Sequence, residues 1–281
     1  MRTLGTLAEA ATFRRSAPSP VVLVPTMGAL HAGHAALIDA ARARAGKGGT
    51  VVVSIFVNPT QFGPGEDLAK YPRTFEVDLE LCAAHGADAV FAPSAGEMYP
   101  AGYSTFIEET VLSRGLCGAQ RPGHFRGVCT VVAKLFNIIR PEIAIFGEKD
   151  HQQLAIIRRM TRDLFLGVEI IGRPTVREPD GLALSSRNRY LSPEEREHAC
   201  RFPAALREAS EEPTPAEIIA KATALITAGT GSAPEYVELV DAETLEPLAA
   251  LDRPAVLAAA VKIGETRLID NVRLAPRHAK V

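Results

Sequence analysis

Short apolar runs alternate with longer helical stretches from Val21 to about Glu178. The apolar runs are rich in β-branched residues and nearly continuous, which is typical of parallel strands covered on both faces. The expected strands are 21–24, 50–57, 89–92, 143–146 and 168–172. Helices are expected between them, over 33–45, 74–85, 128–139 and 152–164. This rhythm predicts an α/β fold in which crossover helices join the strands of a parallel sheet.

The pattern changes after Glu178. Ser192, Pro193 and Glu195 supply a hydroxyl cap, a proline in the first turn and a carboxylate three residues after the cap, which predicts a helix to about Ser210. A second helix and three short strands are then expected, over 216–228, 236–240, 255–262 and 266–274. We therefore expect two domains, an α/β domain over 1–175 and a smaller α+β domain with hairpin pairing over 176–281.

Composition narrows the class of protein. Of 281 residues, 47% are hydrophobic and 23% charged, a globular balance, and the formal net charge of −2 argues against nucleic acid as a partner. Glu9, Arg14 and Arg15 interrupt the first segment where a signal peptide would be apolar, and no apolar run is long enough to span a membrane. Four cysteines without a C-x-x-C pair favour buried thiols in a reducing cytosol over a zinc site or disulfides. We expect a cytoplasmic protein without a membrane partner.

The first candidate for chemistry lies between the first expected strand and a helical stretch. It reads Pro25-Thr26-Met27-Gly28-Ala29-Leu30-His31-Ala32-Gly33-His34. Parallel sheets bind ligands at such strand-to-helix turns, and a helix N-terminus offers N–H groups to phosphate. His31 and His34 share one face of the first turn, so both can point at one phosphate. Taken alone, the pair is equally compatible with two surface histidines or an incidental metal pair.

A second charged segment, 146–153, also follows an expected strand. Lys149 is a compact charge suited to phosphate, Asp150 is an acceptor for a ribose hydroxyl, and Gln153 offers an amide one turn further on. A solvated charge cluster is the alternative, but the position at a strand's carboxyl end favours a site.

A third candidate lies near the expected domain boundary, where Ser185, Ser186 and Arg187 carry two hydroxyls and a guanidinium that suit phosphate oxygens. A serine-containing turn is the alternative. Less specific polar segments are 58–62, 121–127, and 71–74 with Asp78, each also explained as a turn or cap. No role is assigned to four further histidines, His85, His151, His198 and His278.

Six motifs occur in order along the chain, PTMGALHAGH, FVNPTQF, YPRT, RPGHFRGV, FGEKDHQQL and LALSSRNRYLS, and the segment 264–271 near its end extends the match over nearly the whole chain. They resemble the pantothenate synthetase (pantoate–β-alanine ligase) family, within the HIGH-motif nucleotidyltransferase superfamily. The resemblance implies a Rossmann-like parallel sheet in the N-terminal domain, a smaller α+β C-terminal domain that closes over the site, and a homodimer.

The resemblance also implies a reaction, the ATP-dependent condensation of (R)-pantoate with β-alanine to pantothenate, in the presence of Mg2+. The pantoate carboxylate first attacks the α-phosphate of ATP, which forms pantoyl adenylate and releases pyrophosphate. The β-alanine amine then attacks the activated carbonyl and expels AMP.

Site residues are carried over by motif position. The resemblance implies that ATP is bound by Met27, Gly28, Ala29, Leu30, His31, Ala32, Gly33, His34, Gly147, Glu148, Lys149, Asp150, Val176, Leu184, Ser185, Ser186 and Arg187. Those that would act in catalysis are His34, His31, Lys149, Arg187, Ser185 and Ser186. Gln61 and Gln153 match the glutamines that bind pantoate, and Gln61 also matches a position near β-alanine.

Two positions depart from the family pattern. Thr60 stands where methionine is common, and His151 stands where tyrosine is common. Some members carry consecutive carboxylates linked to Mg2+, but here Val77 precedes Asp78. We therefore expect no protein ligand for the metal, which ATP phosphates and water would hold.

Two rival functions remain open. One is a nucleotidyltransferase of the same superfamily with a different acceptor. The uncharged amides of Gln61 and Gln153 are modest evidence against it. The other is a nucleotide-binding regulator without catalysis, which the presence of His34, Lys149 and Arg187 disfavours.

Overall fold

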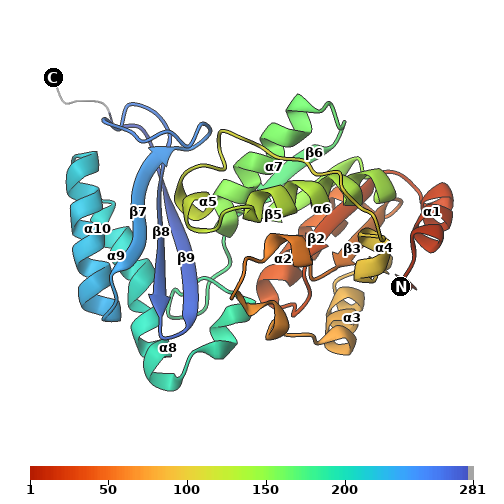
Figure 1. Cartoon of the computed structure of the whole chain (residues 1–281), viewed down its shortest axis with the longest axis horizontal. Coiled ribbons are helices and arrows are strands. Elements are labelled where there is room, and N and C mark those ends of the chain that lie inside the picture. The colour runs from red at the N-terminus through yellow and green to blue at the C-terminus, as the bar shows by residue number, and fades with distance from the viewer. Residues whose placement is uncertain (278–281) are drawn as a thin grey trace. The chain divides into compact units, whose positions relative to one another are not determined.

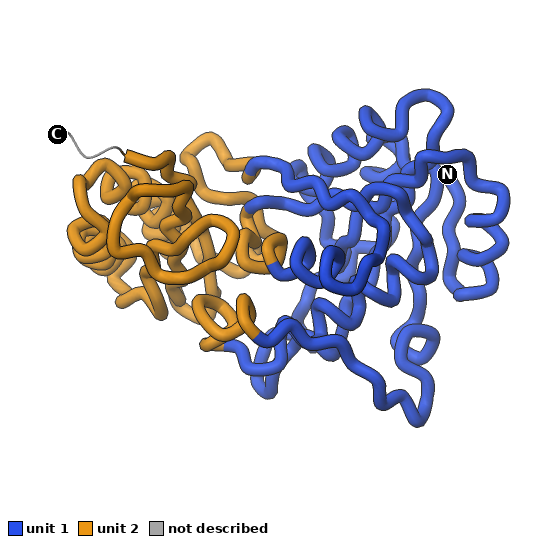
Figure 2. Tube along the Cα trace, turned by 90° about the horizontal axis from the view of Figure 1, so that it is seen from above, with its two compact units in different colours: residues 1–110, 121–148, 156–174 blue, residues 111–120, 149–155, 175–281 orange. Residues whose placement is uncertain are grey.

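The protein is described by a computed structural model of residues 1–277, which forms two compact units (Figures 1 and 2). Unit 1 comprises residues 1–110, 121–148 and 156–174. Unit 2 comprises residues 111–120, 149–155 and the chain from Thr175 on. The sequence pattern does not mark the two short stretches of unit 2, and the expected domain division at residue 175 stays a prediction. His278 lies outside the described residues.

A six-stranded parallel sheet forms the centre of unit 1, in the order β1-β4-β3-β2-β5-β6. Its strands are β1 (Arg2–Leu4), β2 (Val21–Thr26), β3 (Thr50–Ile55), β4 (Ala89–Phe91), β5 (Ile143–Gly147) and β6 (Glu169–Arg173). The strand order reverses between β2 and β5, and open α/β sheets bind ligands outside the carboxyl ends of strands at such a point. The predicted parallel sheet is confirmed.

The helices of this part of the chain are α1 (Leu7–Ser16), α2 (Ala32–Ala45), α3 (Phe75–Ala84), α4 (Ala95–Met98), α6 (His124–Ile139) and α7 (His151–Asp163), which begins in unit 2 and ends in unit 1. Short 3-10 turns are η1 (Pro59–Gln61), η2 (Asp67–Ala69) and η3 (Glu148–Asp150). Four of these helices were expected from the sequence, and their observed bounds lie within a few residues of the prediction.

Both faces of the sheet are buried. Val22 and Val24 of β2 pack with Ile38 of α2 in one apolar cluster. Because side chains alternate along a strand, Val21 and Leu23 point to the opposite face, where they are also fully buried. Helix α6 contacts β2 as well. Coverage of both faces explains why the strands read as continuous apolar runs.

Unit 2 contains an antiparallel sheet in the order β7-β8-β9, with helices packed against it (Figure 1). Its strands are β7 (Pro234–Asp241), β8 (Ala255–Ile263) and β9 (Thr266–Leu274), and its helices are α5 (Leu116–Gln120), η4 (Ser186–Tyr190), α8 (Pro193–Ala199), α9 (Arg201–Ala209) and α10 (Pro215–Thr230). Phe202, Leu206 and Ile218 are fully buried in its apolar core. The small α+β arrangement with hairpin pairing matches the prediction.

The single helix expected from Ser192 to Ser210 is wrong, because the chain forms α8 and α9 with a break at Cys200. Pro203 explains the break. Proline has no N–H to donate to the carbonyl four residues earlier, that of Ala199, and its ring clashes with that carbonyl. The start of the helix is as predicted, since Ser192 and Glu195 form a capping box.

The first elements, β1 and α1, were not expected. Thr6 and Glu9 form a capping box at the start of α1, so a sequence signal for this helix was present. Strand β1 is short and pairs with β4, which lies more than 80 residues later. Its place at the sheet edge depends on that distant partner, so no local pattern reveals it.

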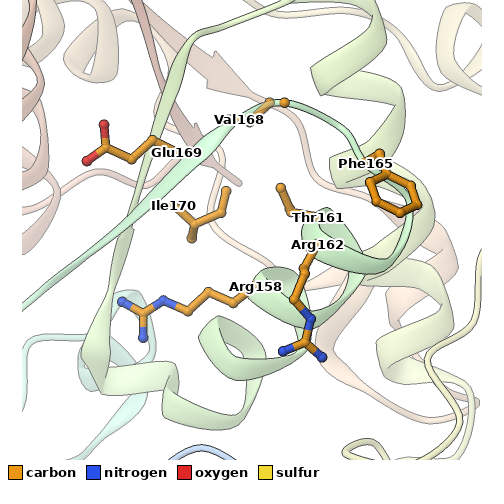
Figure 3. A pocket seen from close by; sticks show the side chains of 8 residues that line it. Arg158, Thr161, Arg162, Phe165, Val168, Glu169 and Ile170 are labelled. Atoms are coloured by element: carbon orange, nitrogen blue, oxygen red, sulfur yellow. The ribbon is translucent and has the colours of Figure 1, made fainter.

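A surface hollow of about 570 Å³ lies beside α7 and β6 in unit 1 (Figure 3). Thr161, Val168 and Ile170 contribute to its lining, together with the exposed ring of Phe165. None of the lining residues belongs to a predicted site, so the hollow adds no candidate to those from the sequence.

The four cysteines are free thiols. Cys82, Cys117 and Cys129 are buried, and burial raises the pKa of the Cys82 and Cys129 thiols to about 12. Cys200 is only half-buried, and its thiol donates to the carbonyl of Glu197. Within residues 1–277, no helix combines the length and the apolar character that crossing a membrane requires.

Candidate active site

The backbone of the turn from β2 into α2 adopts a conformation that is unfavourable for most residues. Gly28 has φ of +83°, and a Cβ there would lie 3.0 Å from Asp78 Oδ2 and 3.1 Å from Ile55 Cγ2. Ala29 also has a positive φ, 51°. Thr26 Oγ1 donates to the Ser54 carbonyl at 2.7 Å and accepts the Gly28 N–H at 3.2 Å. The turn is therefore held to the neighbouring strand β3.

A buried carboxylate holds the second half of the same turn. Asp78 is 1% exposed, and its two oxygens accept the N–H groups of Ala29 at 2.9 Å and Leu30 at 2.8 Å. Thr74, the residue immediately before α3, donates from Oγ1 to Asp78 at 3.0 Å. The sequence marked Asp78 only as a less specific candidate, also explained as part of a turn or cap, and the structure shows that it accepts N–H groups from the backbone of the predicted phosphate-binding turn.

His31 and His34 form the N-terminal cap of α2. His31 Nδ1 accepts the Gly33 N–H at 3.1 Å, and His34 Nδ1 accepts the His31 N–H at 3.3 Å. Because an N–H donor points at each Nδ1, the hydrogen of each neutral ring lies on Nε2. The ring centroids are 4.1 Å apart. The two imidazoles thus place Nε2–H donors beside a helix N-terminus, an arrangement that suits an anion.

The candidate site in unit 1 has a second part besides the β2–α2 turn and its histidines. It is the amide of Gln61 on η1. The side chain is buried, its Oε1 accepts from Asn58 Nδ2 at 3.0 Å, and its Nε2 lies 3.1 Å from Met27 Sδ. The structure therefore brings Gln61 beside Met27 of the β2–α2 turn. Both belong to the residue set predicted from the sequence.

The basic loop before α6 supports Gln61. Arg121 Nη2 and His124 Nδ1 donate to the Gln61 carbonyl at 3.2 Å and 2.8 Å. Arg121 also pairs with Glu66 at 2.6 Å. Burial alone would raise the pKa of Glu66, but the hydrogen bonds and charge of Arg121 outweigh burial and hold this pKa below its usual range. The cation of Arg121 is thus neutralised by a carboxylate.

Gly127 allows α6 to approach η1 closely. A Cβ at Gly127 would lie 2.4 Å from the carbonyl oxygen of Thr60 and 2.7 Å from the Gln61 nitrogen. No larger residue fits there unless the backbone moves. The second glycine of RPGHFRGV therefore allows α6 to pack directly against the backbone of Thr60 and Gln61.

In unit 2, Lys149 lies in η3 and is tied to the antiparallel sheet through its backbone. Its carbonyl accepts from Asn271 Nδ2 at 3.0 Å, and Asn271 lies on β9. His151 Nε2 contacts the Ala242 carbonyl at 3.0 Å, and Gln152 Nε2 donates to the carbonyls of Leu112 and Gly115, both at 2.8 Å. His151, given no role from the sequence, thus fixes the segment that carries Lys149. Gln153 is half-buried in the same helix.

The predicted serine-arginine motif is organised by the loop before it. Leu184 donates its N–H to the Val176 carbonyl at 3.0 Å, which brings two predicted ATP positions together. Arg177 pairs with the buried carboxylate of Asp270 on β9 at 2.6 Å and 2.9 Å, and its hydrogen bond to this carboxylate raises the pKa of Arg177.

The serines of this motif start η4. Ser185 Oγ accepts the Arg187 N–H at 3.2 Å and so caps η4, while Ser186 is buried. Ser185, Ser186 and Arg187 are therefore consecutive residues at the start of one short turn.

Asp78 gives a direct test of how the β2–α2 turn is held. Asp78→Asn keeps the size and one acceptor oxygen but turns an NH2 group toward a backbone N–H. We expect the free energy of unfolding to fall by about 1–3 kcal/mol, the cost of an unpaired buried donor, in chemical denaturation. Glu76→Gln is the matched control, because Glu76 is exposed in the same turn of α3. Superimposable unfolding curves for the two variants would contradict this role.

Comparison with known proteins agrees with the motifs. The family model described as pantoate-beta-alanine ligase matches residues 1–273. A pantothenate synthetase of Myxococcus xanthus is 56% identical over 90% of this chain and 88% of its own length, and one of Sphingopyxis alaskensis is 54% identical over 97% and 98%.

Solved structures give the same result. A pantothenate synthetase from Thermus thermophilus has a TM-score of 0.91 at 47% identity, covering 97% of this chain and 99% of that chain. A pantoate-beta-alanine ligase from Francisella tularensis, complexed with beta-gamma ATP and beta-alanine, has a TM-score of 0.83 at 35% identity, covering 97% of both chains. The chain belongs to the pantoate–β-alanine ligase family.

Proposed function

We propose that this chain condenses pantoate with β-alanine at the expense of ATP, through a pantoyl-adenylate intermediate, and releases AMP and pyrophosphate. The single observation that carries the chemistry is the pair of imidazoles at the start of α2, whose Nδ1 atoms accept backbone N–H groups. Family membership and the ligand complex of the Francisella tularensis relative support the choice of substrates.

The first step joins a carboxylate oxygen of pantoate to the α-phosphorus and breaks the bond between that phosphorus and the pyrophosphate oxygen. Negative charge grows on the phosphate oxygens, so positioned donors and cations accelerate the step. We assign this work to the Nε2–H groups of His31 and His34, to Lys149, and to Ser185, Ser186 and Arg187. A hydrogen bond from His34 to phosphate stabilises this charge without a full proton transfer.

In the second step the amine nitrogen of β-alanine attacks the acyl carbon, the bond to the AMP oxygen breaks, and the nitrogen loses a proton. We assign Gln61 and Gln153 to pantoate, and Gln61 also to the region of β-alanine. The remaining positions of the β2–α2 turn, with Gly147 to Asp150, Val176 and Leu184, are assigned to ATP.

Magnesium is proposed to arrive with ATP as part of the substrate. Among the described residues, no group of three His, Cys, Asp or Glu side chains is arranged to hold a metal ion. Asp78 already accepts two backbone N–H groups. Phosphate oxygens and water are hard ligands that suit Mg2+, so we assign the ion to them.

The reaction itself is tested by pyrophosphate release from ATP and pantoate, with and without β-alanine, together with identification of the nucleotide product. We expect release that depends on pantoate, becomes sustained only with β-alanine, and gives AMP. A nucleotide retained in the product would instead identify a transferase with another acceptor. ATP binding without turnover would identify a regulator.

The assigned phosphate donors are tested by His34→Ala and Lys149→Ala. We expect each to lower the rate of adenylation by about 100-fold or more, the usual cost of one lost transition-state donor. Single-turnover formation of the adenylate measures this directly. His85→Ala is the control, because His85 pairs with Asp39 at the end of α3 and has no assigned role. Rates for His34→Ala and Lys149→Ala within a few-fold of that control would remove both residues from the mechanism.

We also propose a homodimer in the cytoplasm, as the family likeness implies. The free thiols agree with a reducing compartment. One chain has a mass of 30.0 kDa. Light scattering on the purified protein is expected to give twice that mass. A mass of one chain across the accessible concentration range would overturn the dimer.

A further inference from the structure

The amide of Gln61 is held in one orientation by a hydrogen-bonded relay within unit 1. At its centre is Asn58, which is 1% exposed. Asn58 Oδ1 lies 2.9 Å from Thr60 Oγ1, 2.8 Å from the Tyr99 hydroxyl and 3.3 Å from the Thr60 nitrogen. The backbone N–H can only donate, and each hydroxyl has a hydrogen to donate, so this side of the Asn58 amide is its oxygen.

The other side of Asn58 must then be its NH2 group. Nδ2 donates to the Gly127 carbonyl at 3.1 Å, and a carbonyl can only accept, which gives the same assignment independently. Nδ2 also donates to Gln61 Oε1 at 3.0 Å. Because Oε1 accepts here, the NH2 group of Gln61 is the end that faces Met27 Sδ. A thioether is a weak acceptor, so a carboxylate or hydroxyl oxygen of a substrate is a better partner for this group.

We propose that the hydroxyls of Tyr99 and Thr60 are positioning groups, which act through Asn58 to keep the Gln61 NH2 group aimed at an acceptor oxygen of the substrate. This rests on the proposed role of Gln61 in binding pantoate. Neither hydroxyl is assigned to contact substrate. By keeping the Gln61 NH2 group aimed at the substrate, both hydroxyls favour a carboxylate or alcohol oxygen of the substrate over a hydrogen-bond donor at this position. They therefore contribute to substrate selection.

Thr60 contributes a second hydroxyl to the relay, because Oγ1 has a hydrogen to donate to Asn58 Oδ1. Thr60 Oγ1 also lies 3.2 Å from the Tyr99 hydroxyl, so the two groups share the same oxygen of Asn58. Two hydroxyls therefore hold the Asn58 amide in this orientation.

Tyr99 is itself held firmly from the segment that follows α4. Its ring packs edge to face with Tyr103 at 5.0 Å, and Lys134 Nζ lies 4.6 Å from its centre. Burial raises the pKa of Tyr99, so the phenol keeps its hydrogen at neutral pH. Tyr103 belongs to the same aromatic group, but its buried hydroxyl has no hydrogen-bond partner among the described residues.

The test compares Tyr99→Phe, Thr60→Val and the double variant with Tyr103→Phe, which removes a hydroxyl from the same aromatic group outside the relay. We expect each single change to raise the pantoate KM only about twofold, because the second hydroxyl still holds Asn58. The double variant is expected to raise it about tenfold or more, beyond the product of the single effects. The ATP KM and the melting temperature are expected to stay close to those of Tyr103→Phe.

A second measurement does not depend on turnover. The side-chain NH2 signals of Gln61, identified by their loss in Gln61→Glu, are recorded in 15N-labelled protein. We expect faster hydrogen exchange of these signals in the double variant and no change in Tyr103→Phe. If the parent shows no pantoate-dependent reaction, the proposed function fails while these spectra still decide the relay.

Two results would overturn the positioning role. One is a double variant whose Gln61 signals and pantoate KM both match those of Tyr103→Phe. The other is an equal rise in the pantoate and ATP KM values with a fall in melting temperature, which indicates a general structural effect instead.

Discussion

The candidate site depends on one carboxylate that never needs to touch a ligand. Asp78 accepts the N–H groups of Ala29 and Leu30 from within α3 and fixes a turn whose backbone is unfavourable for ordinary residues. A positive φ at Ala29 persists only where its surroundings determine it. Two hydrogen bonds to a buried carboxylate supply that constraint. The start of α2, and with it both histidines, follows directly from this turn.

The same principle recurs in the groups that we propose to face a ligand. In His31, His34 and Gln61, one polar atom is committed to the protein, which determines what the opposite atom presents. Imidazole Nδ1 and the amide oxygen both accept, so Nε2–H and NH2 remain as donors. An active site for phosphate and carboxylate substrates requires donors. The polarity of the site is therefore set by hydrogen bonds that lie outside it.

Local sequence signals explain why much of this was predictable, and contacts between distant segments explain the rest. The strand-to-helix position of His31 and His34 and the cap at Ser192 depend on residues near one another in the chain. The break at Cys200 was also readable from Pro203, so that error is a failure to use a signal that was present. By contrast, the partners of buried polar groups are remote: Asp78 lies 49 residues from Ala29, Tyr99 lies 41 residues from Asn58, and Asn271 lies 122 residues from Lys149. A polar residue inside a helix pattern gives no sign of which remote backbone it will meet.

A residue that faces substrate and a residue that positions a neighbour differ in how freely they can vary. Residues whose polar atoms face substrate are restricted by the chemistry of the reaction. A positioning residue is restricted only in what it offers to its neighbour, so one donor can replace or supplement another. Thr60 illustrates this, because its hydroxyl reaches an oxygen that Tyr99 already holds. Variation in a family motif is thus best interpreted by asking which atom of the next residue it orients, since an altered side chain can leave the chemistry intact and still change how firmly a substrate-binding group is held.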